Sequence, residues 1–213
     1  MSSIDMVSSD NSDKPDKKKP IKYIKLPLKE ALKTVKERAY YAEIDKYFVT
    51  KCTQKKIYDM VDIINNKHNI SLRLLNWFAM KYTAYMKAIT YINEDGVNEM
   101  FDAKISYRAR LNTYSKKYFD PFRRNKKFDY NYDKKDESKL VETTLCQLNF
   151  FKWLFQYNLL EYVEINYDTL KDKIGIHNVQ EKQNKEKKKI PIVIEKKKDY
   201  YIEEECNKIF ISI

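Results

Sequence analysis

Glycine and histidine are scarce in this chain, and each scarcity excludes a class of site. Only Gly96 and Gly175 occur in 213 residues, so no glycine-rich loop can cradle a phosphate as in a P-loop or a dinucleotide-binding fold. His68 and His177 are far apart and close to no cysteine in the sequence. We therefore expect no catalytic triad, no metal site and no cofactor, with both histidines at the surface.

Cysteines and long apolar runs are also few. The three cysteines are widely spaced and odd in number, which argues against a disulfide framework or a zinc finger and favours a reducing compartment. Residues 1–12 have no apolar core, so we expect no secretion signal. The most apolar stretch, residues 148–163, is interrupted by Lys152 and Glu161, well short of a membrane span. A soluble protein without membrane insertion is expected.

What the chain does contain is positive charge and aromatic rings. Its 42 basic and 31 acidic residues give a net charge of +11, which favours anionic partners such as nucleic acid, acidic proteins or anionic lipid. A hydrophobic content of 43%, including 18 Tyr and 10 Phe, is enough for one core. Lysine is common throughout, as an AT-rich genome would produce, so the local arrangement of charge is the better guide.

Apolar periodicity predicts a mainly α fold: a compact helical bundle of five to six helices, with a small C-terminal β element and a disordered N-terminal arm. Residues 1–20 are expected to be a disordered basic arm and residues 21–178 a helical domain. Residues 179–189 are predicted to be a charged linker. Residues 190–213 read as short C-terminal strands.

The sequence predicts the positions of four of these helices. A short helix over residues 57–64 precedes a long one that starts at Ser71 and carries an apolar stripe to Ile92. We favour an ordinary helical hairpin here over a helix-turn-helix, because the second helix is long and its first turn offers only Arg73. Thr144 and Gln147 fit a capping box for an apolar helix at the centre of the bundle. A further helix should follow Asn158 and end near Gly175, and residues 125–139 should be a loop.

A basic-aromatic segment over residues 104–127 is the most informative feature. Aromatic and aliphatic side chains at positions 107, 111, 114 and 118 have helical spacing and are favoured as a core stripe, and Pro121 should stop the helix. Asp120 is expected to shape that turn rather than to act in catalysis. The segment has nine bases against one acid, which favours an anionic partner. The candidate nucleic-acid-binding residues are Lys104, Arg108, Arg110, Lys116, Lys117, Arg123, Arg124, Lys126 and Lys127, with Phe119 and Phe122 as candidates for base stacking.

Nucleic acid is not the only partner that this charge allows. Residues 140–170 carry one base and four acids, so a neighbouring copy or an internal face could neutralise the basic segment.

Several long strings resemble a widespread family of uncharacterised proteins from giant viruses, the nucleocytoplasmic large DNA viruses. They are ISLRLLNWFA (residues 70–79), ISYRARLNTYSKKYFDPFRRN (105–125), ETTLCQLNFFKWL (142–154) and the closing KIFISI (208–213). The resemblance implies an intracellular viral protein, in the host cytoplasm (the viral factory) or the virion. Members often have glycine at the position of Cys146, which implies that this thiol is not required. The family brings no established activity.

Three functions remain open from the sequence. The first is a non-enzymatic viral protein that binds DNA or RNA through the basic-aromatic segment. The second is a structural or scaffold protein of the capsid or core that contacts other viral proteins and forms oligomers through its C-terminal strand. The third and weakest is a metal-dependent nuclease.

Overall fold

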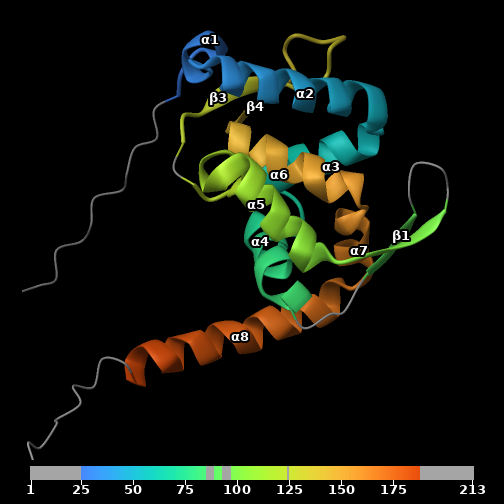
Figure 1. Cartoon of the computed structure of the whole chain (residues 1–213), viewed down its shortest axis with the longest axis vertical. Helices are drawn as coiled ribbons and strands as arrows, with labels where there is room; N and C mark the ends of the chain where they lie inside the picture. Colours follow the sequence, from blue (N-terminus) through green and yellow to red (C-terminus); the bar gives the residue numbers. More distant parts are fainter. Residues whose placement is uncertain (1–24, 85–88, 93–96, 124, 188–213) are drawn as a thin grey trace, which may run out of the picture. The chain divides into compact units, whose positions relative to one another are not determined.

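The computed structural model describes residues 25–84, 89–92, 97–123 and 125–187 (Figure 1). The predicted N-terminal arm and the predicted C-terminal strands lie outside these residues. Within them the chain is mainly α, with eight α-helices and two antiparallel two-stranded sheets. The expected five to six helices were too few. No helix in the described part is long and apolar enough to cross a bilayer. Residues up to Lys171 form one unit and those from Asp172 a second, and each is described by itself.

Helix α6 (Leu145–Gln156) lies at the centre of the first unit. Thr144 and Gln147 form the predicted capping box, with hydrogen bonds of 3.2 Å in both directions. Ten of its twelve residues are buried, because α2 (Val35–Lys51) and α5 (Ala103–Phe119) both pack against it (Figure 1). The prediction of a helix at the centre of the bundle is confirmed.

Aromatic rings from α5 and α6 form the core between these two helices. The ring of Trp153 lies 5.5 Å from that of Tyr107, 6.0 Å from Phe119 and 5.9 Å from Phe150. Its indole N–H donates a 3.0 Å hydrogen bond to Ser106 Oγ. Aromatic pairs in such geometries add about 0.5–1.5 kcal/mol each beyond the area that they bury. The position of α5 is therefore fixed by its apolar face and not by its charges.

The predicted long helix from Ser71 is wrong beyond its first part. α3 (Gln54–Ile64) and the start of α4 (Leu72–Met80) are as expected, and Ser71 Oγ accepts a hydrogen bond from the N–H of Leu74. After α4 comes a short 3-10 helix, η1 (Tyr82–Ala84), and then strand β1 (Ile89–Ile92), which pairs with β2 (Asn98–Phe101). The run from Ile89 to Ile92 is rich in β-branched and aromatic residues, which favours a strand.

A second hairpin replaces the loop predicted over residues 125–139. Strand β3 (Phe128–Asn131) pairs with β4 (Leu140–Thr143), so that Phe128 lies opposite Thr143. Phe128 and Tyr130 alternate with half-exposed residues along β3 and are both buried. The period of two was present in the sequence but was hidden among charged residues.

Two helices take the place of the one expected after Asn158. α7 (Leu159–Ile165) ends at Asn166, and α8 (Tyr167–Lys187) begins at once. α8 runs through Gly175, so the predicted end there is wrong, and the charged linker is helical as far as Lys187. At the other end of the described chain, α1 (Leu28–Ala31) begins after Pro27.

Candidate nucleic-acid interface

The interface begins with α5, whose first turn is capped by Asp102, the acceptor of a 2.8 Å hydrogen bond from the N–H of Ile105. Tyr107, Tyr114 and Tyr118 are buried and Leu111 is half-buried. The stripe at these positions is therefore part of the core, which confirms the prediction from helical spacing. The basic residues of α5 lie around the edges of this buried face.

α5 is interrupted at Ser115, whose φ of 60° and ψ of 163° lie outside the helical region. An L-residue rarely adopts this combination, which is almost confined to glycine. The interruption separates Lys116 and Lys117 from the regular turns that carry Lys104 and Arg108. The bases before and after Ser115 therefore do not lie on one regular helix, and their relative directions cannot be derived from helical spacing alone.

The arginines of the regular part do not gather on one side. Arg108 follows Lys104 by one turn, on the same edge, whereas Arg110 is about 200° around the axis from Arg108. Arg110 Nη2 donates a 3.4 Å hydrogen bond to Oε1 of Gln156 at the end of α6. Arg108 and Arg110 therefore form no continuous arginine surface, because the face between these two edges is buried against the core.

A second group of bases flanks Pro121 in the chain. The N–H of Phe122 donates to Asp120 Oδ1 and the N–H of Arg123 donates to Asp120 O, each at 3.0 Å. Asp120 thus shapes the turn as expected, and α5 ends before Pro121. Asn125 Nδ2 donates a 3.0 Å hydrogen bond to the carbonyl oxygen of Lys117, so the chain returns to the end of α5. We call Lys116, Lys117, Phe122, Arg123 and Lys126 the turn patch.

Charges in and beside the turn patch are neutralised unequally. Lys117 Nζ lies 3.5 Å from Glu37 Oε1, and Lys127 Nζ lies 2.7 Å from Glu142 Oε1. Among the described residues, no carboxylate pairs with the side chains of Lys104, Arg108, Lys116, Arg123 or Lys126. The turn patch therefore keeps three unpaired cations and one that is shared with Glu37.

The two stacking candidates differ in accessibility. Phe119 is fully buried in the aromatic core, at 0% exposure, so its ring is not available to a base and that prediction is wrong. Its place in the core follows from the break at Ser115, which the helical period did not reveal. Phe122 is 49% exposed and remains a candidate. Arg124 lies outside the described residues.

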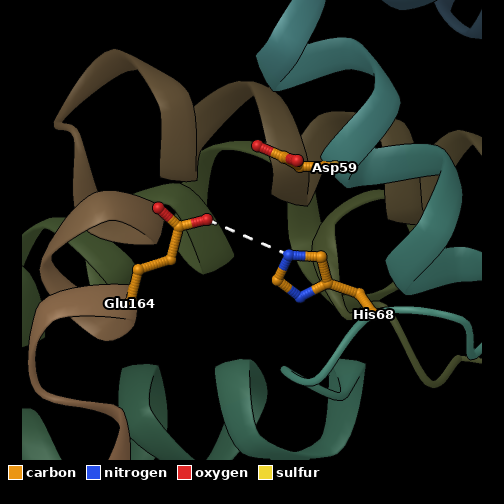
Figure 2. Close-up of side chains that lie close together, drawn as sticks. All are labelled: Asp59, His68 and Glu164. Carbon is orange, nitrogen blue, oxygen red and sulfur yellow. Dashed lines mark ion pairs between the residues drawn. The ribbon is translucent and has the colours of Figure 1, made fainter.

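One further cluster has the side chains of a metal site. Asp59 on α3, His68 in the turn after α3, and Glu164 on α7 point toward one another (Figure 2), with one ligand atom of each within 4.8 Å of the others. All three are half-buried, so His68 lies only partly at the surface, with 21% of its side chain exposed. The sequence shows that Lys55 and Asp59 are four residues apart, one turn of a helix. It does not show that Glu164 lies beside them, because that contact depends on how α7 packs against α3.

The hydrogen bonding of this cluster favours an ammonium group over a metal ion. Lys55 Nζ lies 2.7 Å from Asp59 Oδ2 and 3.6 Å from Glu164 Oε1. His68 Nδ1 accepts a 3.0 Å hydrogen bond from the N–H of Ile70, so the proton of the neutral ring is on Nε2, which faces Glu164. A metal at Nε2 would need that proton to be on Nδ1, against the Ile70 N–H. The donor set does not fit a metal well in this arrangement.

Comparison with known proteins places the chain. The family of unknown function DUF7197 matches residues 30–212. The chain belongs to this family. It is also 34% identical, over 157 residues, to the uncharacterized protein L507 of Acanthamoeba polyphaga mimivirus. The match covers 73% of this chain and 59% of the mimivirus protein. No solved structure matches.

The DUF7197 match and the mimivirus relative together confirm the resemblance to uncharacterised giant-virus proteins. The residues that match the family include the whole of the turn patch and the cluster around Lys55. In this member of DUF7197, Cys146 is fully buried, its Sγ lies 2.9 Å from the carbonyl oxygen of Lys117, and burial raises the pKa of its thiol above the usual value. The position therefore supports the end of α5 rather than offering a reactive sulfur.

Proposed function

We propose that this chain is a non-enzymatic viral protein that binds nucleic acid through the turn patch, in the viral factory or the virion. The observation that carries the proposal is that Lys116, Arg123 and Lys126, unpaired among the described residues, flank Pro121 closely in the chain, next to the 49% exposed side chain of Phe122. Such cations neutralise phosphates and release counterions, which is a sequence-independent source of affinity. An exposed ring adds stacking on an unpaired base.

The remaining candidate bases have secondary roles in this proposal. Lys104 and Arg108 share one edge of α5 and extend the positive field away from the turn. Arg110 and Lys127 are less available, because Gln156 and Glu142 occupy their side chains. We therefore expect limited sequence preference and a site centred on the turn.

Fluorescence anisotropy with single- and double-stranded DNA and RNA, measured across salt concentrations, tests this function. The wild-type protein should lose affinity steeply with salt. The double variant Lys116→Ala/Arg123→Ala should bind more weakly, with a slope of log K against log salt about 1.5 units shallower, since each phosphate contact contributes about 0.7–0.9.

A matched control removes the same charge elsewhere. Lys46 and Lys67 are exposed and lie outside the patch, so Lys46→Ala/Lys67→Ala should keep the wild-type slope. Equal losses in the two double variants would show a general charge effect and would contradict a defined site. Absence of binding at low salt would overturn the proposal.

A scaffold role is the second candidate, and one observation favours it. Met100 on β2 is 81% exposed and Val97 just before this strand is 55% exposed. Exposed apolar residues along a two-stranded hairpin suit contact with another protein. This role predicts self-association or a stable viral partner, lost on deletion of Lys208–Ile213. A monomer unaffected by the deletion would argue against it.

A metal-dependent nuclease has the least support. It requires several carboxylates that converge beside the basic residues. The carboxylate of Asp120 is used by the N–H of Phe122, and that of Glu37 by the N–H of Thr34 and by Lys117.

A further inference from the structure

A cavity of about 290 Å³ lies away from the turn patch, where three elements meet. The end of α2 contributes Phe48 and Cys52, the start of α3 contributes Tyr58, and the β3–β4 hairpin contributes Tyr130, Tyr132 and Lys135. This volume is at the lower limit of ligand sites in proteins, which span about 300–1,000 Å³. It suits a single small ring system.

The walls of this cavity are aromatic rings set edge to face. Tyr58 and Tyr132 have centroids 5.9 Å apart at an interplanar angle of 74°, and Phe48 and Tyr130 have centroids 6.1 Å apart at 67°. In an edge-to-face pair, the ring that offers its edge keeps both of its faces clear of that partner. Tyr130 is 1% exposed and forms part of the floor, whereas Tyr58 is 38% exposed and stands at the rim. Tyr58 is therefore the more accessible of these two rings for a planar ligand.

The charged groups that line the cavity are one carboxylate, Asp133, and two lysines, Lys134 and Lys135. Lys134 is already engaged, with Nζ 2.7 Å from Asp45 Oδ1 and 5.0 Å from the centre of the Tyr130 ring. Lys135 is exposed, and its N–H donates to Asp133 Oδ1 at 3.0 Å, which fixes the backbone beside the cavity. Its ammonium group has no ion-pair partner among the described residues. It is the cation that can meet a phosphate.

Cys52 does not give the cavity a nucleophile. Burial raises the pKa of its thiol to about 11, although Lys56 and a hydrogen bond to Tyr47 act in the opposite direction. The sulfur is therefore a neutral thiol near pH 7 and forms part of an apolar wall. Binding rather than covalent chemistry fits these groups.

We propose that this cavity binds one unstacked nucleobase against Tyr58, with Lys135 at the adjoining phosphate. The proposal deepens the nucleic-acid function proposed above and rests on it. β3 connects the two sites, because Lys126 of the turn patch precedes this strand, Tyr130 lies in it and Tyr132 follows it. The seven residues from Lys126 to Tyr132 are six steps apart along an extended chain, about 20 Å, which a short single-stranded oligonucleotide can cover.

The test compares a free mononucleotide with a short oligonucleotide. Thymidine 5′-monophosphate is titrated into the full-length protein by calorimetry, and a labelled ten-nucleotide oligo-dT is followed by anisotropy. Tyr58→Leu keeps the bulk of the side chain but removes the ring, and should weaken both interactions, with about a tenfold loss for the oligonucleotide. Tyr58→Phe keeps the ring and should bind as the wild type does. Thermal melting of each variant verifies the fold.

The outcomes separate this site from the turn patch. Lys116→Ala/Arg123→Ala should weaken the oligonucleotide and leave the mononucleotide unchanged. If the oligonucleotide binds but Tyr58→Leu has no effect and the mononucleotide does not bind, the cavity proposal is overturned and the proposed function stands. If the mononucleotide alone binds and Tyr58→Leu abolishes it, the cavity holds a free nucleotide and the proposed function fails. If neither ligand binds, both fail.

Discussion

Asn125 Nδ2 donates a hydrogen bond of 3.0 Å to the carbonyl oxygen of Lys117, eight residues earlier in the chain. This bond returns the turn after Pro121 to the end of α5 and sets the spacing between the bases on either side of it. The turn patch therefore depends on a neutral amide as well as on its charged residues.

Replacement of Asn125 by alanine tests this dependence. The Asn125 side chain also donates to Cys146 Sγ and accepts from the N–H of Lys126. Asn125→Ala should therefore lower the free energy of unfolding by about 1–3 kcal/mol, since each hydrogen bond usually contributes about 1 kcal/mol. It should also weaken nucleic-acid binding without changing net charge. Asn112, an exposed asparagine on α5, provides the control, since Asn112→Ala should alter neither property. Denaturant unfolding and anisotropy measure the two effects, and wild-type affinity in Asn125→Ala would contradict the role of the amide.

The break in α5 at Ser115 gives a stability prediction of opposite sign. A non-glycine residue at φ 60° and ψ 163° is strained by about 1–3 kcal/mol. Ser115→Gly should therefore stabilise the protein by about 1 kcal/mol, whereas Ser115→Ala keeps the Cβ and should give no such gain. Thermal or denaturant unfolding of the wild type and of both variants measures these differences in stability. If α5 were a regular helix at this position, glycine would instead cost about 0.5–1 kcal/mol.

The sequence predicted those elements whose signals are local. The capping box at Thr144 and the apolar residues that follow define α6 within one short window, and Pro121 ends α5 where expected. The core stripe through Tyr107 and Tyr114 was read correctly for the same reason. In each case the residues that give the signal lie within about one to two helical turns of one another in the chain.

The elements that were missed depend on distant partners or on strain. Ile89 and Ile92 have a spacing of three that fits a helix, and only pairing with Asn98 and Phe101 makes this segment a strand. Strands of four residues offer too few positions to separate a period of two from one of 3.6. The burial of Phe119 follows from the backbone of Ser115, for which the sequence has no marker. The cavity at Tyr58 joins three segments that are separate in the chain.

Glu37 links the stability of the first unit to pH. Burial opposes ionisation of this carboxyl, but hydrogen bonds from Thr34 and the nearby charge of Lys117 outweigh it, so the pKa of Glu37 is lower than its ordinary value of 4.5. A carboxyl with a lowered pKa contributes its full stabilisation above the unfolded pKa and loses it as pH falls through the folded pKa.

The variant Glu37→Gln isolates this effect. The wild-type protein should be more stable than Glu37→Gln at about pH 6, and the difference in melting temperature should shrink as the pH falls toward about 3. Glu30 is an exposed carboxylate in α1, and Glu30→Gln serves as the control with no change of this kind. If the difference in melting temperature between the wild type and Glu37→Gln stays constant across this range, the neighbours of Glu37 do not lower its pKa.

The last prediction concerns the cation at Asp59 and Glu164. Lys55 pairs with both carboxylates, but its side chain is 73% exposed, so Lys55→Ala should cost less than about 1 kcal/mol, and less still at high salt. If the ammonium group is the cation of this cluster, micromolar zinc should leave the melting temperature of the wild-type protein unchanged. A zinc-dependent rise in melting temperature that disappears in His68→Ala but persists in His177→Ala would instead establish a metal site. In that case the Nδ1–Ile70 hydrogen bond would have to break on binding, since a ring that accepts at Nδ1 holds its proton at the nitrogen facing the metal.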